Sequence, residues 1–243
     1  MATAGANETR AMNWSTRNHD DAGQLAEAVA AEIDAAIDAA LRDRGEALLA
    51  LAGGRTSPPV FRRLAAQARD WSRVTVLPSD ERWVAADHPD CNLRQMREAF
   101  AGADAVHWLS LTPALPQGAA NAAFANGALA SHPQPFDVCM LGMGADGHFA
   151  SLFPGATNLE EALDPANTDA AIEIVPDPMP SAGPYARVSL TLARLLKSRR
   201  LLLVITGADK RAVIERVRAG DTSLPVAALL AAAHPAAEIH WSP

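Results

Sequence analysis

Short apolar segments that end in glycine or proline alternate along this chain with longer segments of helical periodicity. Leu201–Thr206 is the clearest apolar segment and is followed by Gly207, while Ala47–Ala52 runs into Gly53-Gly54. Strands that are apolar on both faces are typical of parallel sheets buried between helices. Because strands that alternate with helices build βαβ units, the sequence predicts an α/β fold. We expect a three-layer, mostly parallel, Rossmann-like sheet of about six or more strands, with helices on both faces.

The remaining elements follow from the same signals. A long helix is predicted from about 20 to 44, because apolar side chains recur there at every fourth position. Shorter helices are expected at 60–68, 92–101, 121–131, 208–219 and 225–233, and further strands at 74–77, 106–111, 138–141, 171–175, 187–192 and 238–241. Residues 1–18 are expected to form a flexible arm before a single domain over 19–243. The proline-rich stretch 176–184 is expected to be a loop at the edge of a site.

Composition excludes several classes of protein. The net charge is −7, and nucleic-acid binding needs a basic face, so we expect no nucleic-acid partner. The chain has two cysteines, which support neither a disulfide framework nor a cysteine-based zinc site, and we expect no metal. No apolar run is long enough for a membrane span, and the first residues lack the apolar segment of a signal peptide. We therefore expect a cytoplasmic protein, either a monomer or a weak homo-oligomer.

The segment from Leu141 to Pro154 carries the strongest chemical signal. It places three glycines within six residues and adds Asp146 and His148 beside them. Glycines allow a sharp turn and a close approach of the backbone to a ligand, while a carboxylate near an imidazole favours acid–base chemistry over packing. The glycines also match the dinucleotide fingerprint G-x-G-x-x-G. Pro154 interrupts the helix that this fingerprint requires, which disfavours a nicotinamide site.

Further candidate residues lie at the ends of other predicted strands. Gly53, Gly54, Arg55 and Thr56 precede a predicted helix, where free N–H groups favour an anion, although an ordinary capped turn is the alternative. Asp80-Glu81-Arg82 is either a ligand-orienting segment or a solvated, charge-balanced loop. Two more cations complete the set, Arg187 at a strand start and Lys210 in a first helical turn, where the helix dipole disfavours a cation unless an anion is bound.

Together these segments resemble the 6-phosphogluconolactonases of the wider glucosamine-6-phosphate deaminase superfamily, over nearly the whole chain. The motifs that carry the resemblance occur in order: Gly53-Gly54-Arg55-Thr56, Asp80-Glu81-Arg82 with His88-Pro89-Asp90-Cys91-Asn92, the run Gly142 to Pro154, Arg187-Val188-Ser189, and Gly207-x-x-Lys210. In the deaminases an acid stands five residues after the histidine of the glycine loop. This chain has Phe153 there, which cannot transfer a proton, so the lactonase branch is favoured.

The resemblance implies hydrolysis of 6-phospho-D-glucono-1,5-lactone to 6-phospho-D-gluconate, without a cofactor. His148 would activate water, Asp146 would orient the imidazole or shape its loop, and Arg82 or N–H groups of the Gly142–Gly147 turn would face the oxyanion. The remaining candidates would bind the substrate and its phosphate group: Gly53, Gly54, Arg55, Thr56, Asp80, Asn92, Gly144, Arg187 and Lys210. Cys91 and Leu93 depart from the commonest lactonase pattern, which leaves the contacts beside Asn92 open.

Two other functions remain open on the sequence. One is a sugar-phosphate deaminase or isomerase of the same superfamily, which Phe153 argues against. The other is a non-catalytic sugar-phosphate-binding domain, which would show affinity without turnover.

Overall fold

The computed structural model describes residues 14–180 and 183–243. Its strands are β1 Trp14–Asn18, β2 Ala47–Leu51, β3 Val74–Pro78, β4 Asp80–Arg82, β5 His107–Trp108, β6 Val138–Leu141, β7 Ala171–Ile174, β8 Arg187–Leu190, β9 Leu201–Thr206 and β10 Ala237–Ser242. Its helices are α1 Ala22–Arg44, α2 Ser57–Ala65, the short 3-10 helix η1 Trp71–Arg73, α3 Asn92–Ala99, α4 Ala123–Ala130, α5 Leu159–Ala162, α6 Leu192–Leu196, α7 Ala208–Arg218 and α8 Pro225–Ala232. None of the described helices is both long and apolar enough to span a bilayer.

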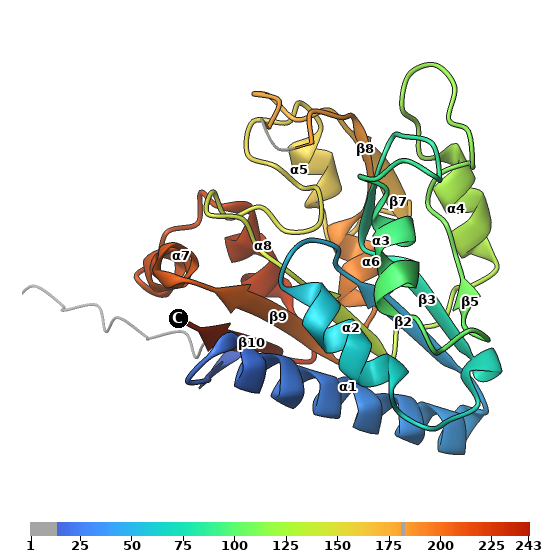
Figure 1. Ribbon diagram of the computed structural model, residues 1–243. Helices are drawn as coiled ribbons and strands as arrows, with labels where there is room; N and C mark the ends of the chain where they lie inside the picture. The colour runs from blue at the N-terminus through green and yellow to red at the C-terminus, as the bar shows by residue number, and fades with distance from the viewer. Residues whose placement is uncertain (1–13, 181–182) are drawn as a thin grey trace, which may run out of the picture.

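A seven-stranded sheet forms the centre of the molecule, in the order β1-β10-β9-β6-β2-β3-β5 (Figure 1). All of its strand pairs are parallel. The chain moves from β2 to β3 on one side and later fills the other side with β6 and β9. The strand order therefore reverses between β2 and β6, where open α/β sheets form a crevice for ligands at the carboxyl ends of the strands.

Both faces of this sheet are buried, because successive side chains of β2 alternate between two apolar clusters. Leu48 and Ala50 belong to one apolar cluster, which contains side chains of α4, α6, α7 and α8. Leu49 and Leu51 belong to the other cluster, which contains side chains of α1, α2 and α3. Figure 1 shows α1 lying along the sheet with α2 beside it. The predicted three-layer, mostly parallel α/β fold is confirmed.

The longest helix, α1, has clear boundaries. Asp21 caps its start by accepting a hydrogen bond from the Gln24 N–H at 2.8 Å, and Gly45 ends it in the left-handed conformation, with φ of 85°. The caps supply hydrogen-bond partners that the helix ends lack. The apolar repeat within the helix faces the sheet, and the side chains of Leu25, Val29 and Ile33 are fully buried.

The structure corrects two of the sequence predictions. Residues 14–18, which were assigned to a flexible arm, form the edge strand β1 beside β10, while residues 1–13 of that arm lie outside the described residues. The Asp80–Arg82 segment, for which a solvated loop was one alternative, forms β4 of a second sheet with the antiparallel order β4-β8-β7. The small sheet is joined to the central sheet at Ser79, the residue between β3 and β4. The Ser79 N–H donates to the Leu51 carbonyl on β2, and the Ser79 carbonyl accepts from the Leu190 N–H on β8, both at 2.9 Å.

Candidate active site

A cavity of about 350 Å³ opens where β2, β6 and β9 end, between the central sheet and the small sheet. This volume is within the range of small-molecule sites. The predicted site residues that line it are Gly53, Gly54, Arg55, Thr56, Asp80, Arg82, Asn92, Gly144, His148, Arg187 and Lys210. Pro180 also lines the cavity, so the described part of the proline-rich loop lies at the site edge as expected.

Asp146 does not line the cavity, but it contacts His148, which does. Its Oδ1 lies 2.6 Å from His148 Nδ1 and also accepts from the His148 backbone N–H at 3.2 Å. Burial alone would raise the pKa of Asp146, but the hydrogen bond and the charge interaction with His148 lower it below the usual value. Because Asp146 occupies Nδ1, the ring presents Nε2 as its second nitrogen for a ligand.

The glycine loop brings the backbone close to this ring. A Cβ atom at Gly144 would lie 2.3 Å from both Cε1 and Nδ1 of His148, so no other residue fits there with the ring in place. The Gly144 N–H donates to the His148 carbonyl at 2.9 Å and closes the loop. The nicotinamide alternative fails on geometry, because Gly147 is followed by a tight turn and not by a helix.

A reversal of the chain after His148 returns Phe153 to the imidazole. The Leu152 N–H donates to the Phe149 carbonyl at 2.9 Å, and Ala150 adopts a left-handed φ of 47°, which is uncommon for a residue other than glycine. As a result, the ring centroids of His148 and Phe153 lie 4.2 Å apart, at an interplanar angle of 32°.

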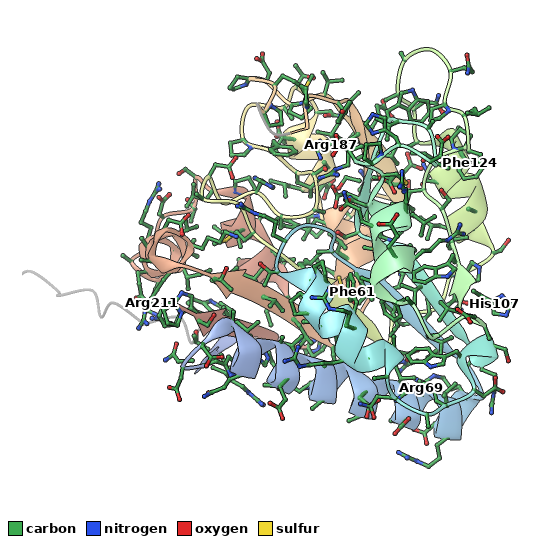
Figure 2. All side chains as sticks on the ribbon, viewed as in Figure 1. Phe61, Arg69, His107, Phe124, Arg187 and Arg211 are labelled. Atoms are coloured by element: carbon green, nitrogen blue, oxygen red, sulfur yellow. The ribbon has the colours of Figure 1, made fainter. Side chains whose placement is uncertain are left out.

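The small sheet supplies two arginines to the same cavity. Arg82 on β4 and Arg187 on β8 are direct cross-strand partners, and like charges in such positions repel. Arg82 donates to the Asp90 carbonyl at 2.5 Å and Arg187 to the Gly183 carbonyl at 2.8 Å, yet the Nε atom of each is buried without a hydrogen-bond partner. Figure 2 places Arg187 at the end of the molecule that holds the small sheet.

Arg187 is 4% exposed, and this burial makes the charge of its guanidinium energetically costly. Desolvation lowers the pKa of its guanidinium, and repulsion from Arg82 acts in the same direction, whereas Asp80 opposes the shift. A bound anion would offset both costs. The pair therefore has the electrostatic properties of an anion site.

Sequence reasoning missed the role of Glu81, the residue between the two cavity-lining side chains of β4. Side chains alternate along a strand, so Glu81 points away from the cavity and is 1% exposed. Its carboxylate accepts from the N–H groups of Arg82, Asn92 and Leu93 at 2.7–2.8 Å. Burial raises the pKa of Glu81, although these donors oppose the shift. The sequence carries no signal for this role, because Asp80, Glu81 and Arg82 are all hydrophilic and show no alternation that would assign Glu81 to a buried face.

Glu81 thereby fixes the start of α3 and with it Asn92. The Asn92 amide donates to the Asp80 carbonyl at 2.7 Å, and its Oδ1 is buried without a hydrogen-bond partner. A Cβ at Gly53 would lie 2.4 Å from that oxygen. Asn92 lines the cavity, and its unpaired Oδ1 is an acceptor that the protein itself leaves unused.

Asp80 links the small sheet to the loop of His148. Its carboxylate accepts from the Ser79 hydroxyl at 3.0 Å and from the Ser151 hydroxyl at 2.5 Å. The Ser151 N–H in turn donates to the Ser189 hydroxyl on β8 at 3.2 Å. Since these serines and Asp80 are all buried, the network holds the His148 loop against the two strands that carry the arginines.

Another part of the cavity wall combines two helix N-termini with two cations, Arg55 and Lys210. Thr56 precedes α2 and makes no side-chain capping bond, so its hydroxyl is free to donate, whereas the Ser57 hydroxyl donates to the Gly53 carbonyl at 3.1 Å. Lys210 lies in the first turn of α7. Burial lowers the pKa of Lys210 and repulsion from Arg55 lowers it further, while Asp209 opposes the shift. Both helix N-termini and both cations favour an anion.

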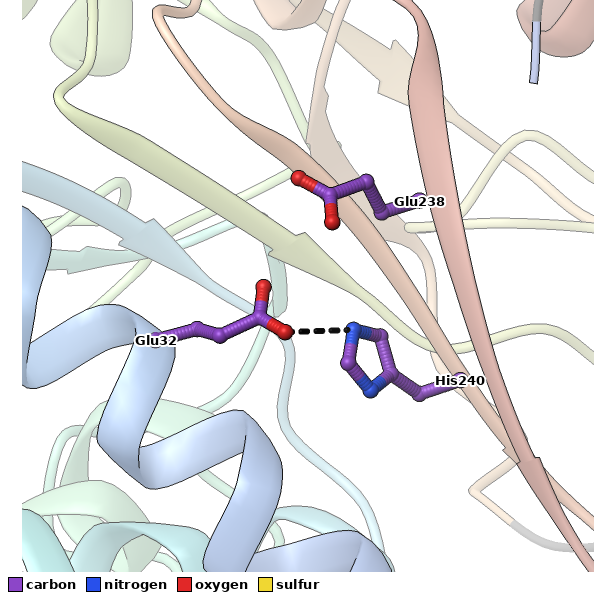
Figure 3. Close-up of side chains that lie close together, drawn as sticks. All are labelled: Glu32, Glu238 and His240. Carbon is purple, nitrogen blue, oxygen red and sulfur yellow. Dashed lines mark ion pairs between the residues drawn. The ribbon is translucent and has the colours of Figure 1, made fainter. Parts of the chain in front are cut away.

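A separate cluster, Glu32, Glu238 and His240, has the ligand types of a metal site (Figure 3). Both carboxylates are already paired with arginines. Arg200 bridges Glu32 at 2.8 Å and Glu238 at 2.6 Å, and Arg17 contacts the same two acids at 2.7 and 3.1 Å. Two guanidinium groups balance the two carboxylates, so the cluster offers no net negative charge to a cation.

Comparisons with known proteins show which family has this sequence and fold. The family model described as glucosamine-6-phosphate isomerases/6-phosphogluconolactonase matches residues 20–241. A 6-phosphogluconolactonase of Rhizobium meliloti is 38% identical, covering 90% of this chain and 94% of its own length, and one of Pseudomonas putida is 37% identical, covering 92% and 90%. The crystal structure of a 6-phosphogluconolactonase from Shewanella baltica superposes with a TM-score of 0.86 at 31% identity, covering 95% of this chain and 98% of that one.

Proposed function

Because the chain belongs to the family of glucosamine-6-phosphate isomerases/6-phosphogluconolactonases, we propose that it hydrolyses 6-phospho-D-glucono-1,5-lactone to 6-phospho-D-gluconate. This reaction is the second step of the oxidative pentose phosphate pathway. The observation that carries the choice within the family is the contact between His148 and Phe153. An apolar ring occupies the place where the deaminases carry an acid, so the site keeps one base and lacks the second acid–base group that isomerisation uses.

In this proposal His148 is the general base. Asp146 holds Nδ1, so Nε2 removes a proton from water as the water oxygen attacks the lactone carbonyl carbon. The resulting imidazolium then gives that proton to the ring oxygen as the bond between carbonyl carbon and ring oxygen breaks. A lactone is a strained ester, so one base and an oxyanion stabiliser are sufficient without a metal or a covalent nucleophile.

Charge on the carbonyl oxygen in the tetrahedral intermediate requires donors. Arg82 is our first candidate, because its Nε is a buried donor without a partner at the cavity wall. The N–H groups of the Gly142–Gly147 turn are the second. Preorganised donors of this kind contribute about 100-fold or more to rate in comparable sites.

The phosphate group of the substrate is assigned to Gly54, Thr56, Arg187 and Lys210, with Arg55 beside Lys210. These residues combine N–H donors, a free hydroxyl and cations that burial or mutual repulsion has made electrostatically costly without an anion. Asp80 and Asn92 supply acceptors for sugar hydroxyls. We further propose that the enzyme is cytoplasmic, forms a single domain that includes β1, acts as a monomer or weak homo-oligomer, and needs no nucleic-acid partner.

A coupled assay tests the function. Freshly generated 6-phosphogluconolactone is added to the protein, and 6-phosphogluconate is measured by NADP-dependent oxidation with a phosphogluconate dehydrogenase. We expect product to form well above the spontaneous rate. A rate equal to spontaneous hydrolysis, or ammonia release from glucosamine 6-phosphate, would overturn the proposal.

A further inference from the structure

Phe153 has a role in this site beyond the absence of an acid. Its side chain is 8% exposed and lines the cavity, and it contacts two charged or chargeable groups. The imidazole of His148 lies against its ring at a centroid distance of 4.2 Å, and the guanidinium carbon of Arg187 lies over the ring at 5.2 Å from its centroid. The phenyl ring is therefore a shared surface for the proposed base and a proposed phosphate-binding cation.

Three contacts together fix the position of the imidazole. The bare backbone of Gly144 approaches one edge, Asp146 holds Nδ1 at 2.6 Å, and Phe153 supports the ring through its face. The first two contacts come from the loop that carries His148 itself. Phe153 supplies the lateral surface that keeps the imidazole from rotating about its side-chain bonds, so that Nε2 stays directed at the cavity.

The same contact has an electrostatic consequence. His148 becomes an imidazolium when it takes the proton of water, and it does so against the phenyl ring that Arg187 also contacts. An aromatic face carries negative potential and attracts cations. Because the phenyl ring of Phe153 contacts the imidazole, its negative potential favours the protonated form of that ring.

On the basis of the proposed function, we propose that Phe153 is a positioning residue that holds the His148 imidazole and stabilises its protonated form during lactone hydrolysis. Phe153 itself exchanges no proton. The proton moves from water to Nε2 and from Nε2 to the leaving ring oxygen, and the phenyl face acts on the state between these two transfers. Its contribution to His148 therefore falls on kcat. Substrate affinity depends on the groups around the phosphate, and the one of these that contacts Phe153, Arg187, is also held by its hydrogen bond to the Gly183 carbonyl at 2.8 Å.

Stepwise fluorination of the phenyl ring tests this role, because it weakens the negative potential of the face while keeping the shape of the side chain. Phenylalanines with one, two and three fluorine atoms are placed at position 153, and kcat and KM are measured for freshly generated 6-phosphogluconolactone. We expect kcat to fall with each fluorine, reaching about tenfold for the trifluoro ring, with KM unchanged within about twofold; a tenfold fall corresponds to about 1.4 kcal/mol. Equal kcat values across the series would overturn the proposal.

A second pair of variants separates the ring from its volume. Phe153→Leu keeps an apolar side chain and removes the aromatic face, so kcat is expected to fall about tenfold or more, and Phe153→Tyr is expected to restore it to near wild type. Wild-type kcat in Phe153→Leu would contradict the proposal. Failure of the proposed function is distinguishable, because the unmodified protein would then show no turnover above the spontaneous rate in the same assay.

Discussion

At the scale of single residues, the proposed chemistry depends on one imidazole nitrogen. His148→Ala removes the base, and general bases contribute about 100- to 10,000-fold to rate. We expect kcat to fall at least about 100-fold with KM little changed, measured against the spontaneous rate. His107→Ala is the matched control, because His107 is exposed on the short edge strand β5 and does not line the cavity. Turnover near wild type in His148→Ala would show that another group activates the water.

Lys210 is assigned to binding, and the chain offers a natural control for it. Lys197 is the other lysine of the sequence, and it is exposed at the end of α6. Lys210→Ala is expected to raise KM about tenfold or more at similar kcat, since a hydrogen bond to a charged group contributes roughly 1.5–3 kcal/mol. Lys197→Ala should leave both constants unchanged. An unchanged KM in Lys210→Ala would remove Lys210 from the phosphate site.

At the scale of elements, the sequence predicted the α/β class and most helices and strands, because buried parallel strands are apolar in themselves. Leu201–Thr206 and Val138–Leu141 match their predicted bounds for this reason. It did not predict β4 as a strand, because Asp80-Glu81-Arg82 is hydrophilic and its strand conformation depends on pairing with β8, far along the chain. The glycine loop was recognisable because its chemistry is local, whereas the pairing of Arg82 with Arg187 depends on register between distant strands.

The junction of α1 with β10 makes a prediction about stability. His240 is fully buried there, with Nδ1 lying 3.0 Å from His19 Nε2 and Nε2 facing Glu32 at 3.5 Å. Burial, together with the nearby charges of His19 and Arg17, lowers the pKa of His240 to about 4. In the unfolded chain a histidine has an ordinary pKa of about 6.5, so the unfolded state binds more protons between these two values. Stability is therefore complete above about pH 6.5 and is lost as the pH falls towards 4.

Urea unfolding at pH 7.5 and pH 5 measures this effect. The free energy of unfolding of the wild type is expected to fall by roughly 2 kcal/mol more than that of His240→Gln, which carries no titrating ring. Comparing the two proteins cancels the contribution of other groups, including Glu32 and Glu238. Equal pH dependence in the two proteins would show that His240 is already protonated in the fold or is not buried in solution.

At the scale of the whole molecule, an acidic protein brings several cationic groups together at one cavity. The net charge is −7, yet four basic side chains line the site, namely Arg55, Arg82, Arg187 and Lys210. Salt screens such interactions over about 10 Å at 0.1 M, so KM for the phosphorylated lactone should rise at least about twofold between about 0.02 and 0.2 M NaCl. The rise should be smaller in Lys210→Ala. A KM that does not change with salt would exclude charge attraction as the main source of affinity.

The position of β1 has a consequence for synthesis of the chain on the ribosome. β1 is the first described element to emerge, and its neighbour in the sheet, β10, is the last described element. The first strand therefore has no partner in the sheet until β10 has left the ribosome, after all the other described strands. Pairing of β10 with β9 on one side and with β1 on the other is the step that completes the described sheet.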